Sequence, residues 1–79
     1  MFKIAILLVN HLANNGFYIL NTEISFKSKI IEIMYSSENE PNDKYMLEYD
    51  TKNHISTYWL NYKNTGWKVT KEERGIIWN

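Results

Sequence analysis

The C-terminal half of the chain carries the pattern that most limits how it can fold. Three short stretches rich in aromatic and β-branched residues are separated by the turn sequences Thr-Lys-Asn and Lys-Asn-Thr-Gly. The stretches are Tyr45–Asp50, Ile55–Tyr62 and Trp67–Thr70. In the second linker, Asn64 and Gly66 can take the positive φ angles that tight hairpins require. The pattern predicts an antiparallel meander of three strands.

Two more strands are predicted upstream of this meander. Apolar residues alternate with polar ones from Glu23 to Lys27, and again from Ile31 to Tyr35, which is typical of half-buried strands. The apolar parity changes between them, so a turn or bulge is expected near Ser28–Lys29. The polar segment Ser36–Lys44 holds the one proline and is predicted to be a loop.

The N-terminal segment Phe2–Asn14 fits an amphipathic helix, although a buried strand is also compatible with such a short apolar run. Leu8 and Leu12 recur at helical spacing, and the following Asn-Asn-Gly is a good helix terminator, so we favour the helix. The apolar run Ile4–Val9 is too short for a membrane helix or a typical secretory segment, and we expect a cytoplasmic location.

A second helical signal lies near the C-terminus. Thr70 and Glu73 have the spacing of a capping box, so one helical turn is expected before Gly75. Taken together, residues 1–79 predict a single α+β domain. It would have one N-terminal helix packed on a small antiparallel sheet of about five strands, ending in the three-strand meander.

Charge is unevenly distributed along a chain that is neutral overall. Residues 1–31 carry three lysines and one glutamate (+2), residues 32–50 carry six acids and one lysine (−5), and residues 51–79 carry five basic residues and two acids (+3). A nucleic-acid-binding protein usually has a clear basic surplus, because phosphate contacts supply much of its affinity. The balance therefore argues against direct binding to nucleic acid.

No catalytic motif stands out. The chain has no cysteine and three widely separated glycines, so thiol chemistry, a thiolate metal site and a phosphate-cradling loop are not expected. Glu48, Asp50 and His54 form the one grouping with acid–base character, but such residues are also common at hairpin ends. His11, on an apolar helical face, is more typical of a core histidine than of a ligand. We expect no enzyme activity, cofactor or metal site.

Seven of the twelve aromatic residues lie in residues 45–79, and they carry the functional hypothesis. Core packing, a protein interface and base stacking are all compatible with such a set. A single helix about 20 Å long cannot cover a sheet of five strands. Either the sheet curls into a partial barrel, or another chain covers the face that carries Trp59.

The function we infer is that of a non-enzymatic protein-binding module, with a second copy as the simplest partner, hence a homodimer. Its binding residues would be aromatic and acidic: Tyr58, Trp59, Tyr62, Trp67, Glu38, Glu40 and Asp43. The acidic segment would attract a basic surface on a partner, such as the cleft of a nucleic-acid-binding protein. Small size and residues with AT-rich codons suit an inhibitor encoded by a phage or mobile element. The alternative is a single-stranded nucleic-acid-binding protein that uses the same aromatics with Lys68.

Overall fold

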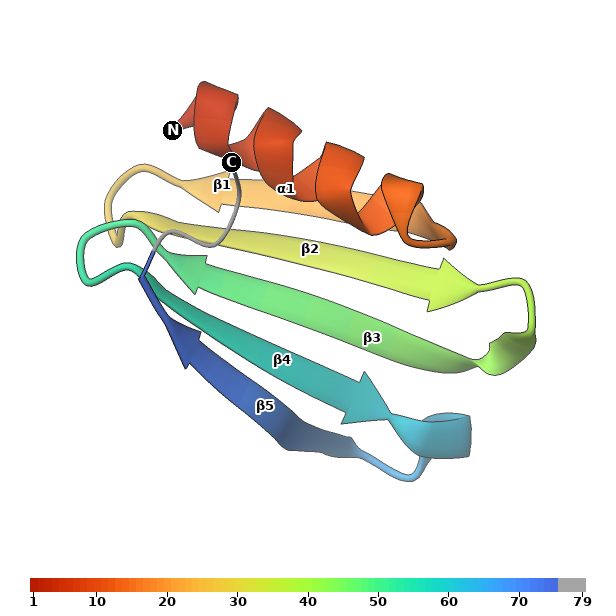
Figure 1. The fold of residues 1–79 in the computed structure, drawn as a ribbon. Helices are drawn as coiled ribbons and strands as arrows, with labels where there is room; N and C mark the ends of the chain where they lie inside the picture. The colour runs from red at the N-terminus through yellow and green to blue at the C-terminus, as the bar shows by residue number, and fades with distance from the viewer. Residues whose placement is uncertain (76–79) are drawn as a thin grey trace.

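The computed structural model describes residues 1–75, which form one α-helix followed by a five-stranded antiparallel sheet (Figure 1). The sheet order β1-β2-β3-β4-β5 follows the chain order, so every connection is a hairpin. The predicted α+β architecture is confirmed. The elements are α1 (Phe2–Asn14), β1 (Phe17–Ser25), β2 (Ile30–Ser37), β3 (Glu40–Asp50), β4 (Ile55–Asn61), the short 3-10 turn η1 (Tyr62–Asn64) and β5 (Trp67–Arg74).

The helix forms because its apolar residues fall on one side. Ala5, Leu8 and Leu12 are spaced three and four residues apart and are buried against the sheet. At the C-terminal end of α1, the Asn15 side chain donates a hydrogen bond to the His11 carbonyl at 2.7 Å. Gly16 then reverses the chain with φ +89°. The predicted helix and its stop are confirmed.

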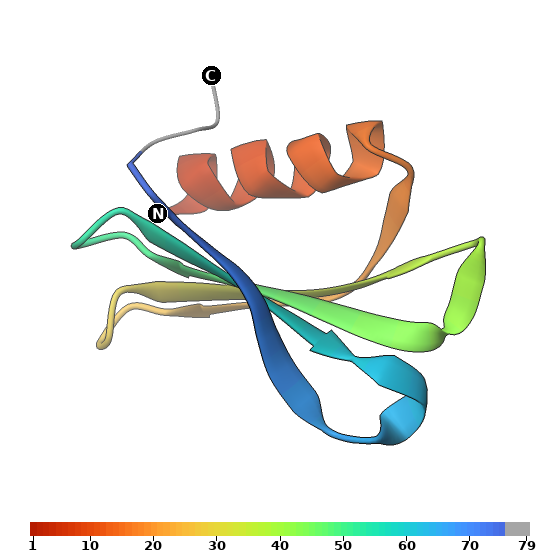
Figure 2. The same ribbon diagram turned by 60° about the horizontal axis from the view of Figure 1, so that its bottom comes forward.

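The core lies between α1 and the central strands. Alternate residues of β2 and β3 point toward the helix, as strand geometry requires. The buried apolar residues are Ala5, Leu8 and Leu12 of α1, Ile31, Ile33 and Tyr35 of β2, and Leu47 and Tyr49 of β3. Figures 1 and 2 show that α1 lies over the β1 side of the sheet, while β4 and β5 extend past it.

The predicted turn at Ser28–Lys29 and the positive φ angles of the second linker are confirmed. Lys29 has φ +59°, and Ser28 donates to the Ser25 hydroxyl through both its backbone N–H and its own hydroxyl. In the β4–β5 connection, Asn64 has φ +61° and Gly66 has φ +116°.

The predicted loop Ser36–Lys44 is wrong. β2 continues to Ser37 and β3 begins at Glu40, with a two-residue turn between them. The polar residues of this segment are used inside the hairpin: the buried Ser36 hydroxyl donates to the Asp43 carbonyl at 2.9 Å. The polar composition of this segment therefore resembles that of a loop, although its polar groups form hydrogen bonds to one another within a hairpin of two strands.

The predicted helical turn after Thr70 is also wrong. β5 continues through this segment to Arg74, and Ser56 and Thr57 of β4 pair with Glu73 and Glu72. The Thr70 hydroxyl donates to the Tyr58 carbonyl across the hairpin at 3.3 Å instead of capping a helix. Cross-strand pairing has overridden a local signal. Trp78, which belongs to the predicted aromatic set, lies outside the described residues.

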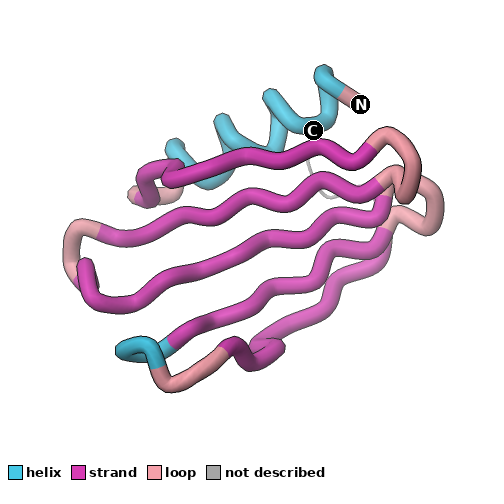
Figure 3. The backbone as a smooth tube through the Cα atoms, turned by 180° about the vertical axis from the view of Figure 1, so that it is seen from behind, coloured by secondary structure: helices cyan, strands magenta, loops and turns pink. Residues whose placement is uncertain are grey.

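The sheet is twisted but open. β1 and β5 form its two edges and are not paired with each other, so the sheet does not close into a barrel. Seen from behind, the sheet face opposite α1 has no helix or loop over it among residues 1–75 (Figure 3). We call this face the open face. No helix of the described residues is long and apolar enough to cross a membrane.

Candidate functional site

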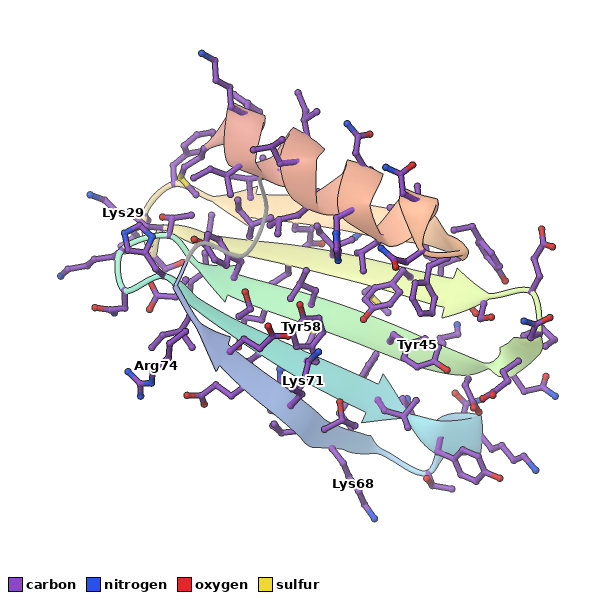
Figure 4. All side chains as sticks on the ribbon, in the orientation of Figure 1. Lys29, Tyr45, Tyr58, Lys68, Lys71 and Arg74 are labelled. Carbon is purple, nitrogen blue, oxygen red and sulfur yellow. The ribbon has the colours of Figure 1, made fainter. Side chains whose placement is uncertain are left out.

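On the helix side, a cleft of about 530 Å³ opens where β4 and β5 extend beyond the end of α1. His11 and Asn15 of α1 form one wall, and Tyr45 and Tyr58 from the sheet line its floor, with Lys71 on the far side. Tyr45, Tyr58 and Lys71 rise from the helix-bearing face in Figure 4. Its volume is in the range of pockets that hold small ligands.

The aromatic rings of this cleft are already in contact with one another. The Phe17 and Tyr35 rings meet edge to face with centroids 5.0 Å apart, and Tyr35 stacks on Tyr45 at 5.3 Å. Phe17 and Tyr45 are 5.6 Å apart. These are ordinary distances for paired aromatic side chains. The three rings therefore pack against one another beside the core and do not enclose an empty binding site.

The polar groups of the cleft are also engaged. Lys71 Nζ lies 2.7 Å from Glu73 and 4.6 Å from the centre of the Tyr58 ring. Burial raises the pKa of Tyr35 to about 12, and burial together with the Glu73 charge raises the pKa of Tyr58. Both phenols are neutral at physiological pH.

The open face is different, because its residues line up in rows across the strands. One row is apolar and crosses four strands. The cross-strand register places Met34 beside Met46, Met46 beside Trp59, and Trp59 beside Val69. Val69 is 53% exposed and the other three are partly exposed. We call these four residues the apolar row.

The next row on the open face is acidic. Glu23 pairs with Glu32, Glu32 pairs with Glu48, and Thr57 pairs with both Glu48 and Glu72. Within residues 1–75 the ion pairs are Lys71–Glu73 at 2.7 Å and Arg74–Glu72 at 3.7 Å, so the first three carboxylates have no ionic partner there. Glu23, Glu32, Glu48 and Glu72 form what we call the acidic row.

The predicted aromatic binding residues do not share one surface. Strand alternation turns the Tyr58 side chain toward the cleft and pairs Trp59 with Met46 on the open face, although Trp59 also contributes to the cleft lining next to Tyr58. Trp67 pairs with Asn61 and lies on the same side as Trp59, at the end of the apolar row. Tyr62 belongs to η1, beyond the end of β4, and is 51% exposed.

The predicted acidic residues lie elsewhere. Glu38 is in the β2–β3 turn, and Glu40 and Asp43 are at the start of β3. Asp43 is only 4% exposed, and its carboxylate accepts a hydrogen bond from the Lys63 backbone N–H at 3.1 Å. Asp43 thus holds η1 against β3. The hydrogen bond that protonated Glu40 donates to the Asp43 carboxylate raises the pKa of Glu40. These three residues are at the β2–β3 turn, away from the acidic row.

The possible acid–base grouping is not assembled. The Asp50 carboxylate accepts hydrogen bonds from the Asn53 side chain and from the backbone N–H groups of Lys52 and Asn53, and these bonds lower its pKa. His54 Nδ1 lies 3.3 Å from the Tyr49 hydroxyl. These contacts are those of the turn that joins β3 to β4. Among residues 1–75, no group of three or more His, Cys, Asp or Glu side chains is arranged to hold a metal ion.

The sequence interpretation missed most of the apolar and acidic rows. Met34, Met46 and Val69 are ordinary strand residues by themselves, and Glu23 and Glu72 are far apart in the sequence. They become neighbours through the register of four hairpins. The signal was the alternation of each strand, which could have been combined across strands once the turns were placed.

Comparisons with protein-family models, with curated proteins and with solved structures return no match to this chain.

Proposed function

We propose that this chain is a non-enzymatic protein-binding module that binds a basic protein surface through its open face. The observation that carries the proposal is the apolar row next to the acidic row, on a sheet face that no described element covers. Trp and Met are enriched at the centres of protein interfaces, and charged residues at their borders. A partner with an apolar ridge beside lysines or arginines would match both rows.

The acidic row supports a basic partner for an energetic reason. Like charges placed directly opposite each other on neighbouring strands destabilise a sheet. Glu23, Glu32 and Glu48 make two such pairs with no cation of residues 1–75 within ion-pair distance. Basic side chains of a partner would relieve this repulsion on binding and would speed up encounter.

The open face is a better binding surface than the cleft. In the cleft, Lys71 is already paired with Glu73 and the rings are packed together. On the open face, Glu23, Glu32 and Glu48 have no cation of residues 1–75 within ion-pair distance, and no described element covers the apolar row. The unmatched groups of a surface are those that a partner can satisfy.

The acidic row also argues against the alternative, a single-stranded nucleic-acid-binding protein. Four carboxylates beside Trp59 would repel the phosphates of a strand stacked on that ring. Lys68 and Lys71, which such a protein would use, are in register with Leu60 and Tyr58 on the other face.

By covering a basic surface, the module would inhibit a nucleic-acid-binding partner. This is the role that we propose for it, as an inhibitor encoded by a phage or mobile element.

A synthetic amphipathic helix of leucine and lysine is a suitable first probe of this proposal. The titration would use a protein that keeps Trp59 as its one tryptophan, through Trp67→Phe and Trp78→Phe. We expect the fluorescence of Trp59 to shift to the blue as the peptide covers it. Replacing both Glu32 and Glu48 by Gln should weaken binding by about tenfold, or about 1.4 kcal/mol.

Two controls make this titration specific. Glu38→Gln removes a carboxylate from the β2–β3 turn and should leave the affinity unchanged, and a leucine–glutamate peptide should not bind. Binding that is indifferent to the Glu32 and Glu48 replacements would contradict the proposal. So would tight, steeply salt-dependent binding of oligothymidine, which would favour the nucleic-acid alternative.

A further inference from the structure

The two edges of the sheet are protected to very different degrees. Free strand edges present unpaired N–H and C=O groups, and charged side chains are a common protection against pairing with another chain. β5 carries five charged residues in its eight positions: Lys68, Lys71, Glu72, Glu73 and Arg74. β1 carries one charged residue, Glu23, in nine positions. β1 is therefore the edge open to strand pairing.

The helix above β1 has an apolar flank turned toward the same edge. Phe2, Ile6, Val9 and Ala13 are spaced at i, i+4, i+7 and i+11, about a quarter turn away from the buried stripe of Ala5, Leu8 and Leu12. Phe2 is 64% exposed and Ile6 is 59% exposed. We call these four residues the helix flank.

A groove of about 360 Å³ connects the helix flank to β1. Phe2, Ile6 and Val9 of α1 line it from above, and Thr22 and Ile24 of β1 line it from below. An unpaired strand and an apolar helix surface thus lie along one edge of the molecule. An occupant that supplies both a strand and an apolar helix would match both parts of this edge.

We propose that a second copy of this chain occupies this edge. The two β1 strands would pair antiparallel about a two-fold axis, joining the two five-stranded sheets into one. The two copies of α1 would then lie side by side on the same face, and their helix flanks would cover each other. Antiparallel helices also bring opposite ends of their dipoles together.

One two-fold axis satisfies both contacts. In the helix pair, an axis between Leu7 and Leu8 places Phe2 opposite Ala13 of the second copy, large against small, and Ile6 opposite Val9 of the second copy. Ile6, Val9 and Thr22 line the same groove, so we place the same axis near Thr22 in the strand pair.

This axis also avoids a clash of charges in the strand pair. With Thr22 on the axis, Glu23 lies opposite Asn21 of the second copy, and no glutamate faces another. Asn21 is a suitable donor to this carboxylate, because its side-chain amide already donates to Glu23 within one strand at 3.3 Å.

The exposed apolar side chains along this edge supply about half of what a standard interface buries. Phe2, Ile6, Leu20 and Phe26 are 46–64% exposed along this edge. At about 150–250 Å² for a large side chain, roughly 100 Å² of each is uncovered. These four side chains sum to about 400 Å², half of the roughly 800 Å² per partner of a standard interface, and Val9, Tyr18 and the paired strand backbone add to it.

Sedimentation equilibrium of the full chain tests the proposal. We expect a species of twice the 9.5 kDa chain mass, with a dimer dissociation constant in the micromolar range. Ile6→Glu should raise this constant by at least tenfold, because it places charges in the helix flank contact. Hydrogen exchange should show β1 amides more protected at high protein concentration than at low.

Leu7→Glu is the matched control, since Leu7 is on the same helix, is 48% exposed and points away from β1. It should leave the dimer intact. If Ile6→Glu proves unfolded by circular dichroism, Phe2→Lys answers the same question from the other end of the flank. A wild-type chain that is monomeric at several hundred micromolar would overturn the proposal.

A dimer that responds equally to Ile6→Glu and Leu7→Glu would also overturn it, as would a dimer broken by Trp59→Ser and not by Ile6→Glu. The latter result would place the second copy on the open face. The dimer proposed here leaves the apolar row free, so the leucine–lysine peptide titration can succeed or fail independently of it.

Discussion

The two faces of this sheet are built from the same strands, but only one of them is covered within residues 1–75. On the helix side, Ile33 and Leu47 are fully buried in register with each other. One residue along each strand, Met34 and Met46 are also in register, on a face that nothing in residues 1–75 covers. The strands thus place apolar side chains on both faces, but the helix covers those of one face only.

This comparison separates stability from binding. A residue under α1 contributes to folding, because its burial exists in the free chain. A residue of the apolar row contributes mainly when a partner arrives. The following changes test that separation, from the largest expected effect to the smallest.

Neighbouring substitutions on β3 sharpen the comparison most. Leu47→Ala, under α1, should lower the free energy of unfolding by about 2–5 kcal/mol, because it removes fully buried methyl groups and leaves a cavity. Met46→Ala, one residue away on the open face, should cost less than about 1 kcal/mol. Urea unfolding monitored by circular dichroism measures both. Equal losses would mean that the open face is also part of the core.

Acidic residues offer a second contrast between buried and exposed. Asp43→Ala leaves the Lys63 N–H without its acceptor and should cost about 1–3 kcal/mol of stability. Glu38→Ala, in the exposed β2–β3 turn, should change stability by less than about 0.5 kcal/mol. Thermal unfolding of the two variants at matched pH measures both changes in stability. An Asp43→Ala variant as stable as the wild type would show that Asp43 does not hold η1 against β3.

The phenol of Tyr35 should make the helix-side face sensitive to alkali. Its pKa is about 12 in the folded chain and 10.0 when unperturbed. Between these values the folded chain holds a proton that the unfolded chain has lost, so stability falls as pH rises through this window. The loss between pH 9 and pH 11 should be on the order of 1 kcal/mol.

Urea unfolding at pH 9 and pH 11 measures this slope, with Tyr35→Phe as the comparison because it cannot ionise. The slope should be shallower in Tyr35→Phe than in the wild type. An identical slope in both would show that other groups are responsible.

The smallest effect is expected on the open face, and it has the opposite sign. Glu32→Gln removes the repulsion between Glu32 and its neighbours Glu23 and Glu48, so stability should rise by about 0.2–1 kcal/mol. The gain should shrink at high salt, which screens exposed charges. Glu73→Gln, which loses the ion pair with Lys71, should not be stabilising. A Glu32→Gln variant that is less stable than the wild type would mean that repulsion between the carboxylates of the acidic row does not destabilise the sheet.

Much of the fold could be predicted from the sequence, because local patterns and tertiary structure agree along most of the chain. The helix stop at Asn15 and Gly16 and the positive φ at Gly66 are local properties, and both were predictable. The strand containing Asp43 was not, since its polar side chains look like a loop until the hairpin pairs them. Thr70 and Glu73 carry a helical signal that pairing with β4 overrides.

The candidate site was less predictable than the fold. That Trp59 and Tyr58 point to opposite faces could be predicted, because strand alternation is a local property. The neighbours of Trp59 depend on the register of three separate hairpins, and each hairpin has its own turn length or bulge. A shift of one residue in any of them would exchange the apolar row for other residues.

The most direct test of the central claim is a map of the binding face in solution. Backbone amide NMR shifts of the ¹⁵N-labelled chain would be followed while the leucine–lysine peptide is added. The account predicts that the largest shifts fall on Met34, Met46, Trp59 and Val69, with the acidic row beside them and little change at the buried helix residue Leu8. Shifts concentrated instead on Tyr45, Tyr58 and Lys71, around the cleft of the helix-bearing face, would contradict it.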